Sequence, residues 1–358
     1  MSVSFSVNSN IHNYDVVVQA SSAFIGDLAR IPWSCFVVDG NVWDLYATTL
    51  LKDLQLAETI ILPVNEDRKD LESVKELYDQ LVTRSAKRNL TLVSVGGGIL
   101  QDITGFTAST LYRGIHWIFV PTTLLAQADS CIGSKTSLNY RGYKNLIGTF
   151  YPPEQVHIYP PFLNTLADPD FFSGLGEVIK LHLMGGQILY RQLSQNLSAI
   201  VSRQPDALLR TIQSSLKVKL DYMAGDEFDT GRRNMLNFGH DFGHALEFTS
   251  NFAVPHGQGV IFGMLAANLV AMHRGFLDAD LEKDIIRNLL IPGLKARPSP
   301  AALDPEMIIS AMKKDKKRTG DLLALIMMQN DFNFIRVEDL SPEEVSMVLD
   351  ECKQVLGW

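Results

Sequence analysis

The chain has 358 residues, of which 46% are hydrophobic, and a formal net charge of −8 at pH 7. This length and apolar content allow a large buried core and favour two domains over one. The negative charge argues against nonspecific nucleic-acid binding, although a basic pocket can exist within an acidic protein. We therefore expect a globular protein whose partners are small molecules rather than nucleic acids.

Targeting features are absent from the sequence pattern. The first fifteen residues have neither a basic segment nor an apolar core, and no run reaches the roughly 18 apolar residues that span a bilayer. Three widely separated cysteines, Cys35, Cys131 and Cys352, fit a reducing compartment. We expect a cytoplasmic protein without a membrane partner.

The first half of the chain alternates short β-branched runs with longer amphipathic stretches. This pattern predicts βαβ units around a mostly parallel sheet. The expected strands cover residues 35–40, 59–64, 91–98, 116–122 and 155–160. Helical periodicity covers residues 71–87, and a further helix is expected to begin near Gln101 and Asp102.

From about Ser173 the pattern changes to long helical segments. The expected helices cover residues 173–186, 205–223, 237–250, 257–274, 279–290 and 304–316, and a late hairpin is expected to join 322–328 with 332–337. The fold class is therefore an α/β domain with a mostly parallel sheet over residues 1–168, followed by a mainly α-helical domain over residues 169–358.

Three histidines stand close together in the second half. His240 and His244 lie one helical turn apart on one helix face, and His256 follows in an expected loop. Two imidazoles on one face, a third from a loop and a carboxylate from elsewhere can hold a divalent metal with one position open for substrate. Two histidines one turn apart are explained equally well if one of them is a hydrogen-bonded core residue.

A run of glycines, Gly96 to Gly98, falls between an expected strand and an expected helix. Glycines there let the backbone approach a ligand, and the helix N-terminus offers N–H groups to a pyrophosphate. The run lacks the spacing of the Rossmann fingerprint, so a packing role remains open. Asp39 and Asn41 follow the first strand of this region, where a ribose or a simple turn explains them equally well.

Polar residues in the segment 121–153 stand among apolar and small neighbours. They are Asp129, Lys135, Lys144 and Asn145. We interpret these lysines as buried, and a buried lysine needs a partner, for which a phosphate is an obvious candidate.

Glu177 and Lys180 are expected on one helix face, where an ordinary ion pair is the alternative to a functional role. Lys219, Arg233 and Lys316 add further cations. Each alone is explained by a solvated surface position, but together they favour a polyanionic substrate.

Seven motifs occur in order between Asp39 and Lys317, and together they resemble dehydroquinate synthase and the wider sugar phosphate cyclases. They are GGGILQDITGF, YRG, PTTLLAQADS, SKTSLN with KNLIGTF, GLGEVIK, RNMLNFGHDFGHALE and HGQGV. The resemblance covers most of the chain. It implies an NAD-binding first domain and a second domain that binds metal and substrate.

The resemblance implies a role for particular residues. A divalent metal, zinc or cobalt, would be held by Glu177, His240 and His256. NAD would contact Asp39, Asn41, Glu66, Lys69, Gly97, Gly98, Ile99, Asp102, Thr122, Thr123, Asp129, Lys144, Phe162, Thr165 and Leu166. Substrate phosphate would meet Lys135, Asn145, Lys180, Asn237 and His244, with Arg113 reaching in from the partner of a homodimer. A substrate carboxylate would meet Lys219, Arg233 and Lys316. The residues implied in catalysis are Asp129, Lys135, Lys180, Lys219, Arg233, Asn237, His244 and Lys316.

The implied reaction oxidises a hydroxyl with NAD, eliminates phosphate, returns the hydride and closes a carbocycle by an aldol step. The cationic pocket of Lys219, Arg233 and Lys316 favours 3-deoxy-arabino-heptulosonate 7-phosphate, converted to 3-dehydroquinate and phosphate in the shikimate pathway of aromatic amino acid biosynthesis.

The sequence departs from the usual family pattern at GSKTSLN, GHDFGH and GLGEVIK. These departures leave open another 2-keto-3-deoxy sugar phosphate or sedoheptulose 7-phosphate as the substrate. A metal-dependent NAD polyol dehydrogenase and a noncatalytic scaffold are the alternatives from other classes.

Overall fold

The structure is a computed structural model that describes residues 3–313 and 323–358. The chain divides into two compact units, Met1–Leu166 and Ala167–Trp358. In the described ranges, no helix combines the length and the apolar character that crossing a bilayer requires. All three cysteines are buried free thiols.

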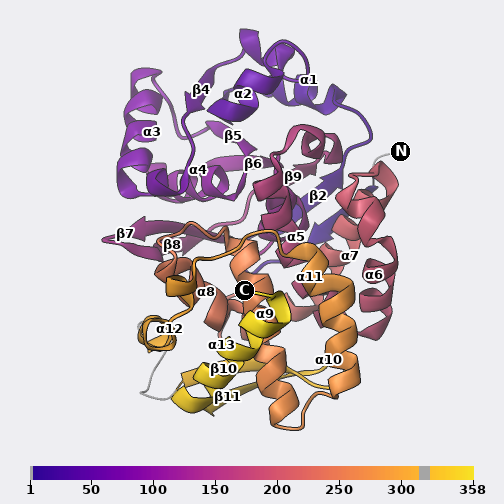
Figure 1. Cartoon of the computed structure of the whole chain (residues 1–358). Helices are drawn as coiled ribbons and strands as arrows, with labels where there is room; N and C mark the ends of the chain where they lie inside the picture. Colours follow the sequence, from indigo (N-terminus) through magenta and orange to yellow (C-terminus); the bar gives the residue numbers. More distant parts are fainter. Residues whose placement is uncertain (1–2, 314–322) are drawn as a thin grey trace. The chain divides into compact units, whose positions relative to one another are not determined.

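The first unit is built on a seven-stranded sheet, in the order β1-β2-β9-β6-β5-β3-β4. Figure 1 draws this unit in indigo to magenta, with most of these strands labelled. Its strands are β1 (Val3–Val7), β2 (Tyr14–Val18), β3 (Ser34–Asp39), β4 (Thr59–Leu62), β5 (Thr91–Gly96), β6 (His116–Pro121) and β9 (Gln155–Ile158). Only the β1 and β2 pair in this sheet is antiparallel. Strands of a sheet covered on both faces are apolar throughout, and Cys35 to Val38 in β3 are all buried. The predicted mostly parallel sheet is therefore confirmed.

Helices connect these strands. They are α1 (Ala23–Ala29), α2 (Gly40–Tyr46), α3 (Leu71–Thr83) and α4 (Gly98–Thr110), with short turns η1 (Lys52–Leu56), η2 (Glu66–Arg68), η3 (Leu111–Arg113), η4 (Ala126–Ser130) and η5 (Pro160–Thr165). Helix α4 begins at Gly98, earlier than the expected start near Gln101. Gly96 ends β5, Gly97 is the N-cap residue and Gly98 is the first residue of α4, so the glycine run joins the strand to the helix.

A hairpin of β7 (Lys135–Tyr140) and β8 (Tyr143–Phe150) forms a separate two-stranded sheet. The sequence pattern did not predict it. The expectation of buried lysines in this region is wrong, because Lys135 and Asn145 are exposed and Lys144 is half-buried. A two-stranded ribbon cannot enclose its side chains as a layered sheet does.

The second unit is mainly helical, as expected. Its elements are α5 (Asp168–Met184), α6 (Gln187–Val201), α7 (Pro205–Met223), η6 (Arg232–Asn237), α8 (His240–Thr249), α9 (His256–His273), α10 (Ala279–Ile285), η7 (Ile286–Leu290), α11 (Ile291–Gly293), η8 (Pro300–Leu303), α12 (Pro305–Lys313), β10 (Leu323–Met328), β11 (Phe334–Leu340) and α13 (Pro342–Leu356). β10 and β11 pair antiparallel, which confirms the late hairpin. Helix α9 is buried on nearly all sides and forms the centre of this unit's core.

Glycines set the spacing between α5, α8 and α9. A Cβ on Gly176 would lie 2.1 Å from the carbonyl oxygen of Gly257, and one on Gly263 would lie 1.8 Å from that of Gly239. Neither distance is possible for a side chain, so these backbones approach each other as only glycine permits. Gly239 also has a φ of 78°, which favours glycine at the turn before α8.

Candidate active site

The close approach of the three helices brings a carboxylate and two imidazoles together. Glu177 follows Gly176 in α5, His240 follows Gly239 at the start of α8, and His256 precedes Gly257 at the start of α9. His256 is the first residue of a helix and not part of a loop, since Pro255 before it serves as the N-cap residue. The three candidate ligand atoms lie within 4.8 Å of one another.

The donor set fits a divalent metal such as zinc. Oε1 of Glu177 is 3.5 Å from Nε2 of His240 and 3.1 Å from Nε2 of His256. One carboxylate and two imidazoles match the three-ligand arrangement of catalytic zinc, which leaves a further position for substrate.

Both imidazoles are oriented by their second nitrogen. Nδ1 of His240 lies 3.2 Å from the carbonyl oxygen of Phe238, and Nδ1 of His256 lies 2.8 Å from Oε1 of Glu247. When Nδ1 carries the proton and donates it to these oxygens, the lone pair of Nε2 faces Glu177. The sequence pattern identified the two histidines but not the groups that orient them.

The charges in this cluster are tightly coupled. Glu177 and Lys180 are both buried, and Nζ of Lys180 lies 2.5 Å from Oε2 of Glu177, so this is no exposed helix pair. Burial would raise the pKa of Glu177, but Lys180 and the imidazoles outweigh it and hold that pKa well below its usual value. Burial and the charge of Lys180 lower the pKa of His240 to about 4. Glu247 and Glu177 outweigh burial at His256 and raise its pKa to about 10. A position where carboxylates favour positive charge this strongly also favours a cation.

A pocket opens beside the cluster. Three of the residues expected at the site line it, namely Asn237, His240 and His244. The remaining lining residues that the structure describes are Asn234, Asp241, Met312, Ala324, Leu325, Ile326 and Arg336. The ring centroids of His240 and His244 lie 5.1 Å apart. The pocket therefore offers imidazole, amide and charged groups above an apolar floor.

The expected carboxylate pocket is only partly described. Lys219 and Arg233 are buried in α7 and η6, but Lys316 lies outside the described residues. The guanidinium of Arg233 donates to the carbonyl oxygen of Glu227. Asp226 accepts hydrogen bonds from the backbone N–H groups of Thr230, Gly231 and Arg233. Burial would raise the pKa of Asp226, but these hydrogen bonds stabilise the carboxylate more strongly and lower its pKa to about 2. This turn fixes the backbone that carries Arg233.

In the first unit, candidate nucleotide residues gather at the carboxyl ends of neighbouring strands. β3 pairs with β4 on one side and with β5 on the other, so the chain order reverses beside it. Ligands of open α/β sheets bind at such a switch point. A Cβ on Gly96 would lie 3.3 Å from Cβ of Asp39, and one on Gly97 would lie 2.9 Å from Cγ2 of Thr123. A glycine-lined helix start therefore lies beside both side chains, an arrangement that fits a dinucleotide.

Other residues of the expected NAD site lie around this edge. Asp39 accepts a hydrogen bond from N of Asn41 and so also caps α2. Oγ1 of Thr165 lies 2.5 Å from the hydroxyl of Tyr46, which joins the end of the unit to α2. Phe162 is buried in the core beside Tyr46. Gly98 and Ile99 belong to the first turn of α4, Thr122 follows β6, and Leu166 caps η5.

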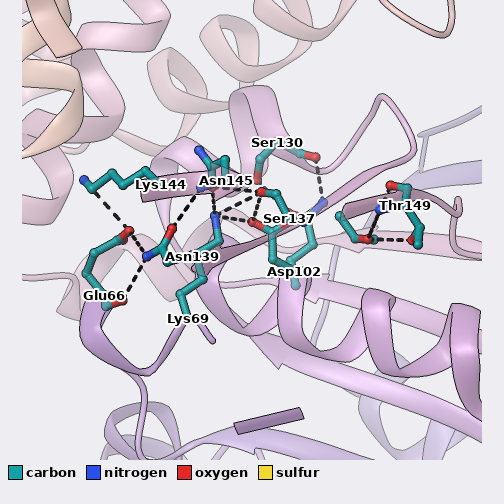
Figure 2. A network of polar contacts seen from close by, with 11 residues as sticks. Glu66, Lys69, Asp102, Ser130, Ser137, Asn139, Lys144, Asn145 and Thr149 are labelled. Atoms are coloured by element: carbon teal, nitrogen blue, oxygen red, sulfur yellow. Dashed lines mark hydrogen bonds and ion pairs between the residues drawn. The ribbon is translucent and has the colours of Figure 1, made fainter. Parts of the chain in front are cut away.

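A polar network joins the β7–β8 hairpin to η2 and α4, and Figure 2 shows its side chains pointing toward one another. Nζ of Lys69 lies 2.6 Å from Oδ2 of Asp102, 2.6 Å from Oδ1 of Asn145 and 3.2 Å from Oγ of Ser137. An ammonium group has three protons, so these acceptors satisfy Lys69 completely. Asn145, expected at the substrate phosphate, thus contacts residues expected at NAD. Lys69 would have to release one acceptor to bind a nucleotide.

The same network holds two further expected residues. Nδ2 of Asn139 donates to Oε1 of Glu66 at 2.9 Å, and Nζ of Lys144 lies 3.8 Å from Oε1 of Glu66. Elsewhere in this unit, Asp129 lies in η4, Lys135 begins β7, and Arg113 is exposed in η3.

Ser137 lies in the GSKTSLN segment, one of the departures from the usual family pattern, and its hydroxyl lies at the centre of this network. It is 2.9 Å from Oδ1 of Asn145 and 3.2 Å from Oδ2 of Asp102. The departure from the family pattern was visible in the sequence, but its position beside Asp102 was not.

We expect Ser137→Ala to loosen the hairpin, because a hydrogen bond to a charged group contributes about 1.5–3 kcal/mol. Hydrogen exchange of residues 135–150 should become faster by about tenfold or more. Ser6→Ala is the matched control, since Ser6 also donates from a strand to an aspartate, Asp15, in the same unit. Unchanged exchange in the hairpin of Ser137→Ala would contradict this role.

Sequence reasoning missed several residues of the second unit's site. Arg336 lies outside every motif, and Asn234, although it lies within RNMLNFGHDFGHALE, was given no role. Asp241 was noted only as a departure from the family pattern. Glu247 lies three residues after His244 and seven after His240, so helical spacing alone could have placed it on the same face.

The fold and the site define an enzyme with a dinucleotide-type sheet in one unit and a carboxylate–imidazole metal centre in the other. Residues 59–173 match the family described as 3-dehydroquinate synthase N-terminal, and residues 174–318 match 3-dehydroquinate synthase C-terminal. The chain belongs to the 3-dehydroquinate synthase family, which confirms the resemblance seen in its motifs.

Individual relatives agree. A 3-dehydroquinate synthase of Acidithiobacillus ferrooxidans is 36% identical over 349 residues, which cover 95% of this chain and 94% of that protein. A 2-epi-5-epi-valiolone synthase from Streptomyces hygroscopicus subsp. jinggangensis, solved with NAD+ and Zn2+ bound, is 26% identical with a TM-score of 0.84 and covers 98% of this chain and 99% of that chain. A 2-deoxy-scyllo-inosose synthase, complexed with carbaglucose-6-phosphate, NAD+ and Co2+, is 21% identical with a TM-score of 0.82, covers 98% of this chain and all 100% of that one, and shares the fold.

Proposed function

We propose that this protein is a 3-dehydroquinate synthase that converts 3-deoxy-arabino-heptulosonate 7-phosphate to 3-dehydroquinate and phosphate. The observation that carries the proposal is the cluster of Glu177, His240 and His256 beside a pocket lined by His244 and Asn237. Several reactions are compatible with such a site. The similarity to a dehydroquinate synthase over nearly the whole chain supports this one among them.

We assign NAD to the glycine-lined edge of the first unit and a divalent metal, zinc or cobalt, to Glu177, His240 and His256. When bound, NAD accepts and returns a hydride, and the metal stabilises negative charge on substrate oxygens. Relatives solved with NAD+ and with Zn2+ or Co2+ support both assignments.

The chain's own residues bind and orient the substrate. Lys180 is buried against Glu177 and places a positive charge beside the metal ligands, where it favours an anionic phosphate. His244 lines the pocket and can donate a hydrogen bond to the same phosphate. Arg233, held in a fixed turn, is suited to a carboxylate because a guanidinium binds both of its oxygens.

The identity of the sugar rests on the cationic residues of the second unit. A related cyclase acting on sedoheptulose 7-phosphate or another 2-keto-3-deoxy sugar phosphate remains the second candidate. Asp241 is the observation that favours it, because this acidic group lines the pocket where a carboxylated substrate would bind. We further propose a cytoplasmic homodimer in which Arg113, exposed in η3, completes the phosphate site of the partner subunit.

Product analysis tests the reaction. The purified protein is incubated with NAD, zinc or cobalt, and separately with 3-deoxy-arabino-heptulosonate 7-phosphate, sedoheptulose 7-phosphate and glycerol. We expect inorganic phosphate and a carbocyclic product of the mass of 3-dehydroquinate from the first compound. Cyclisation of sedoheptulose 7-phosphate alone would favour the second candidate. Oxidation of glycerol without phosphate release would identify a polyol dehydrogenase. No turnover of these compounds or of a panel of other 2-keto-3-deoxy sugar phosphates would favour a scaffold.

A further inference from the structure

Glu247 is a buried carboxylate next to the metal centre that no expected role uses. It lies on α8, and only 2% of its surface is exposed. Its Oε1 is 2.8 Å from Nδ1 of His256. We propose that Glu247 is a positioning residue that holds His256 in the orientation and tautomer that bind the metal, an inference that rests on the metal site of the proposed function.

The imidazole of His256 lies between two carboxylates. Nδ1 faces Glu247 at 2.8 Å, and Nε2 faces Glu177 at 3.1 Å. An imidazole that binds a metal is neutral, because the metal takes the place of one proton, and it keeps one proton on the other nitrogen. With the proton on Nδ1 and donated to Glu247, the lone pair lies on Nε2 and points to the site shared with Glu177 and His240.

His256 needs such support because its own side chain is not enclosed. It is the first residue of α9, and its side chain is 34% exposed, whereas that of His240 is 12% exposed. An imidazole in this position can rotate unless a hydrogen bond fixes the ring. Glu247 is the group that supplies this bond.

Close packing of α8 on α9 directs Glu247 to this place. A Cβ on Gly243 would lie 2.9 Å from the carbonyl oxygen of Gly259, and one on Gly259 would lie 3.4 Å from Cγ of Glu247. The two glycines let the side chain of Glu247 run along the first turn of α9. A carboxylate beside the N-terminus of this long helix is also favoured by the helix dipole.

A second arrangement of the same groups provides the alternative. His244, Glu247 and His256 also place ligand atoms within 4.8 Å of one another. A metal there would bind Nδ1 of His256 and would use Glu247 as a direct ligand. A neutral imidazole cannot offer lone pairs on both nitrogens, so the two arrangements exclude each other and make opposite predictions for Glu247→Gln.

The test measures cobalt and zinc binding directly, by the visible spectrum of the cobalt protein and by competition with a chelator. Loss of a group that orients a ligand weakens metal binding by about 10–100-fold, which we expect for Glu247→Ala. In Glu247→Gln the amide oxygen still accepts the Nδ1 proton, so we expect a loss of less than about tenfold. In Glu247→Asp the side chain is one methylene shorter, so its oxygen no longer reaches Nδ1 of His256, and this variant should bind cobalt and zinc more weakly than Glu247→Gln. It also keeps the test open if the alanine variant does not fold.

Glu282→Ala is the matched control. Glu282 is a buried glutamate of the same unit, 3% exposed, on α10 rather than in the cluster. It should leave the cobalt spectrum and the affinity unchanged.

Two results would overturn the inference. One is wild-type affinity in both Glu247→Ala and Glu247→Asp. The other is equal loss in Glu247→Gln and Glu247→Ala together with normal binding by Glu177→Gln, which would place the ion on His244, Glu247 and His256. If the wild-type protein binds neither cobalt nor zinc, the metal assignment of the proposed function fails as well. Because binding is measured without turnover, these failures are distinguishable.

Discussion

Replacing Glu177 by glutamine is expected to abolish cobalt and zinc binding and to lower turnover by more than about 1,000-fold. The carboxylate is the anionic ligand of the site, and a neutral amide is a poor substitute for it. The loss should exceed the roughly 10–100-fold effect of groups that only orient a ligand. Metal content after dialysis and the rate of phosphate release measure the two effects.

The same change should also destabilise the second unit, and this effect has to be separated from metal loss. Removing one partner of a buried ion pair costs about 3–5 kcal/mol, because Lys180 would remain buried without its carboxylate. The double variant Glu177→Gln with Lys180→Met should regain much of that stability, since an apolar side chain no longer needs a partner. It should still bind no metal. Recovery of metal binding in the double variant would show that Glu177 is not a ligand.

Arg233→Ala is expected to lower kcat/KM for 3-deoxy-arabino-heptulosonate 7-phosphate by about 30-fold or more, since truncating one partner of a buried charged contact costs about 2–5 kcal/mol. Turnover of a heptulose phosphate that lacks a carboxylate, such as sedoheptulose 7-phosphate, should fall much less. The ratio of kcat/KM values for the two substrates is the measurement.

The ratio is needed because Arg233 also has a structural partner. Its guanidinium donates to the carbonyl oxygen of Glu227, so the alanine variant will lose some stability whatever the substrate. Arg233→Lys keeps the charge and serves as the comparison. An equal fall for both substrates would contradict the assignment of Arg233 to the carboxylate.

The pattern of apolar residues along the sequence predicted most of the fold, because apolar residues occupy the buried positions of strands and helices. Five of the parallel strands, β3, β4, β5, β6 and β9, are apolar runs between turn residues, and such runs are typical of strands in a largely covered parallel sheet. The β7–β8 hairpin was missed because one of the two buried positions of β7 is the polar Thr136, and β8 has no buried residue, so no apolar alternation marks either strand. Its position depends on contacts with Lys69 and Asp102, which no local pattern records.

In the candidate site, too, local spacing predicted some contacts, whereas others depend on how the helices pack. His240 and His244 are related by helical spacing, so their proximity could be predicted. Glu177 and His256 join them only because Gly176, Gly239 and Gly257 let three helices approach closely, and this is a property of packing. The glycines were present in the motifs, but which backbone each one contacts could not be inferred from one sequence.

The ratio of phosphate released to NADH accumulated tests the central claim most directly. The protein is supplied with NAD equimolar to its sites, a divalent metal and an excess of 3-deoxy-arabino-heptulosonate 7-phosphate. If the hydride returns to the substrate in each turnover, many phosphates are released per NAD and no NADH accumulates. Release that stops after one phosphate per NAD, with NADH formed in equal amount, would contradict the account.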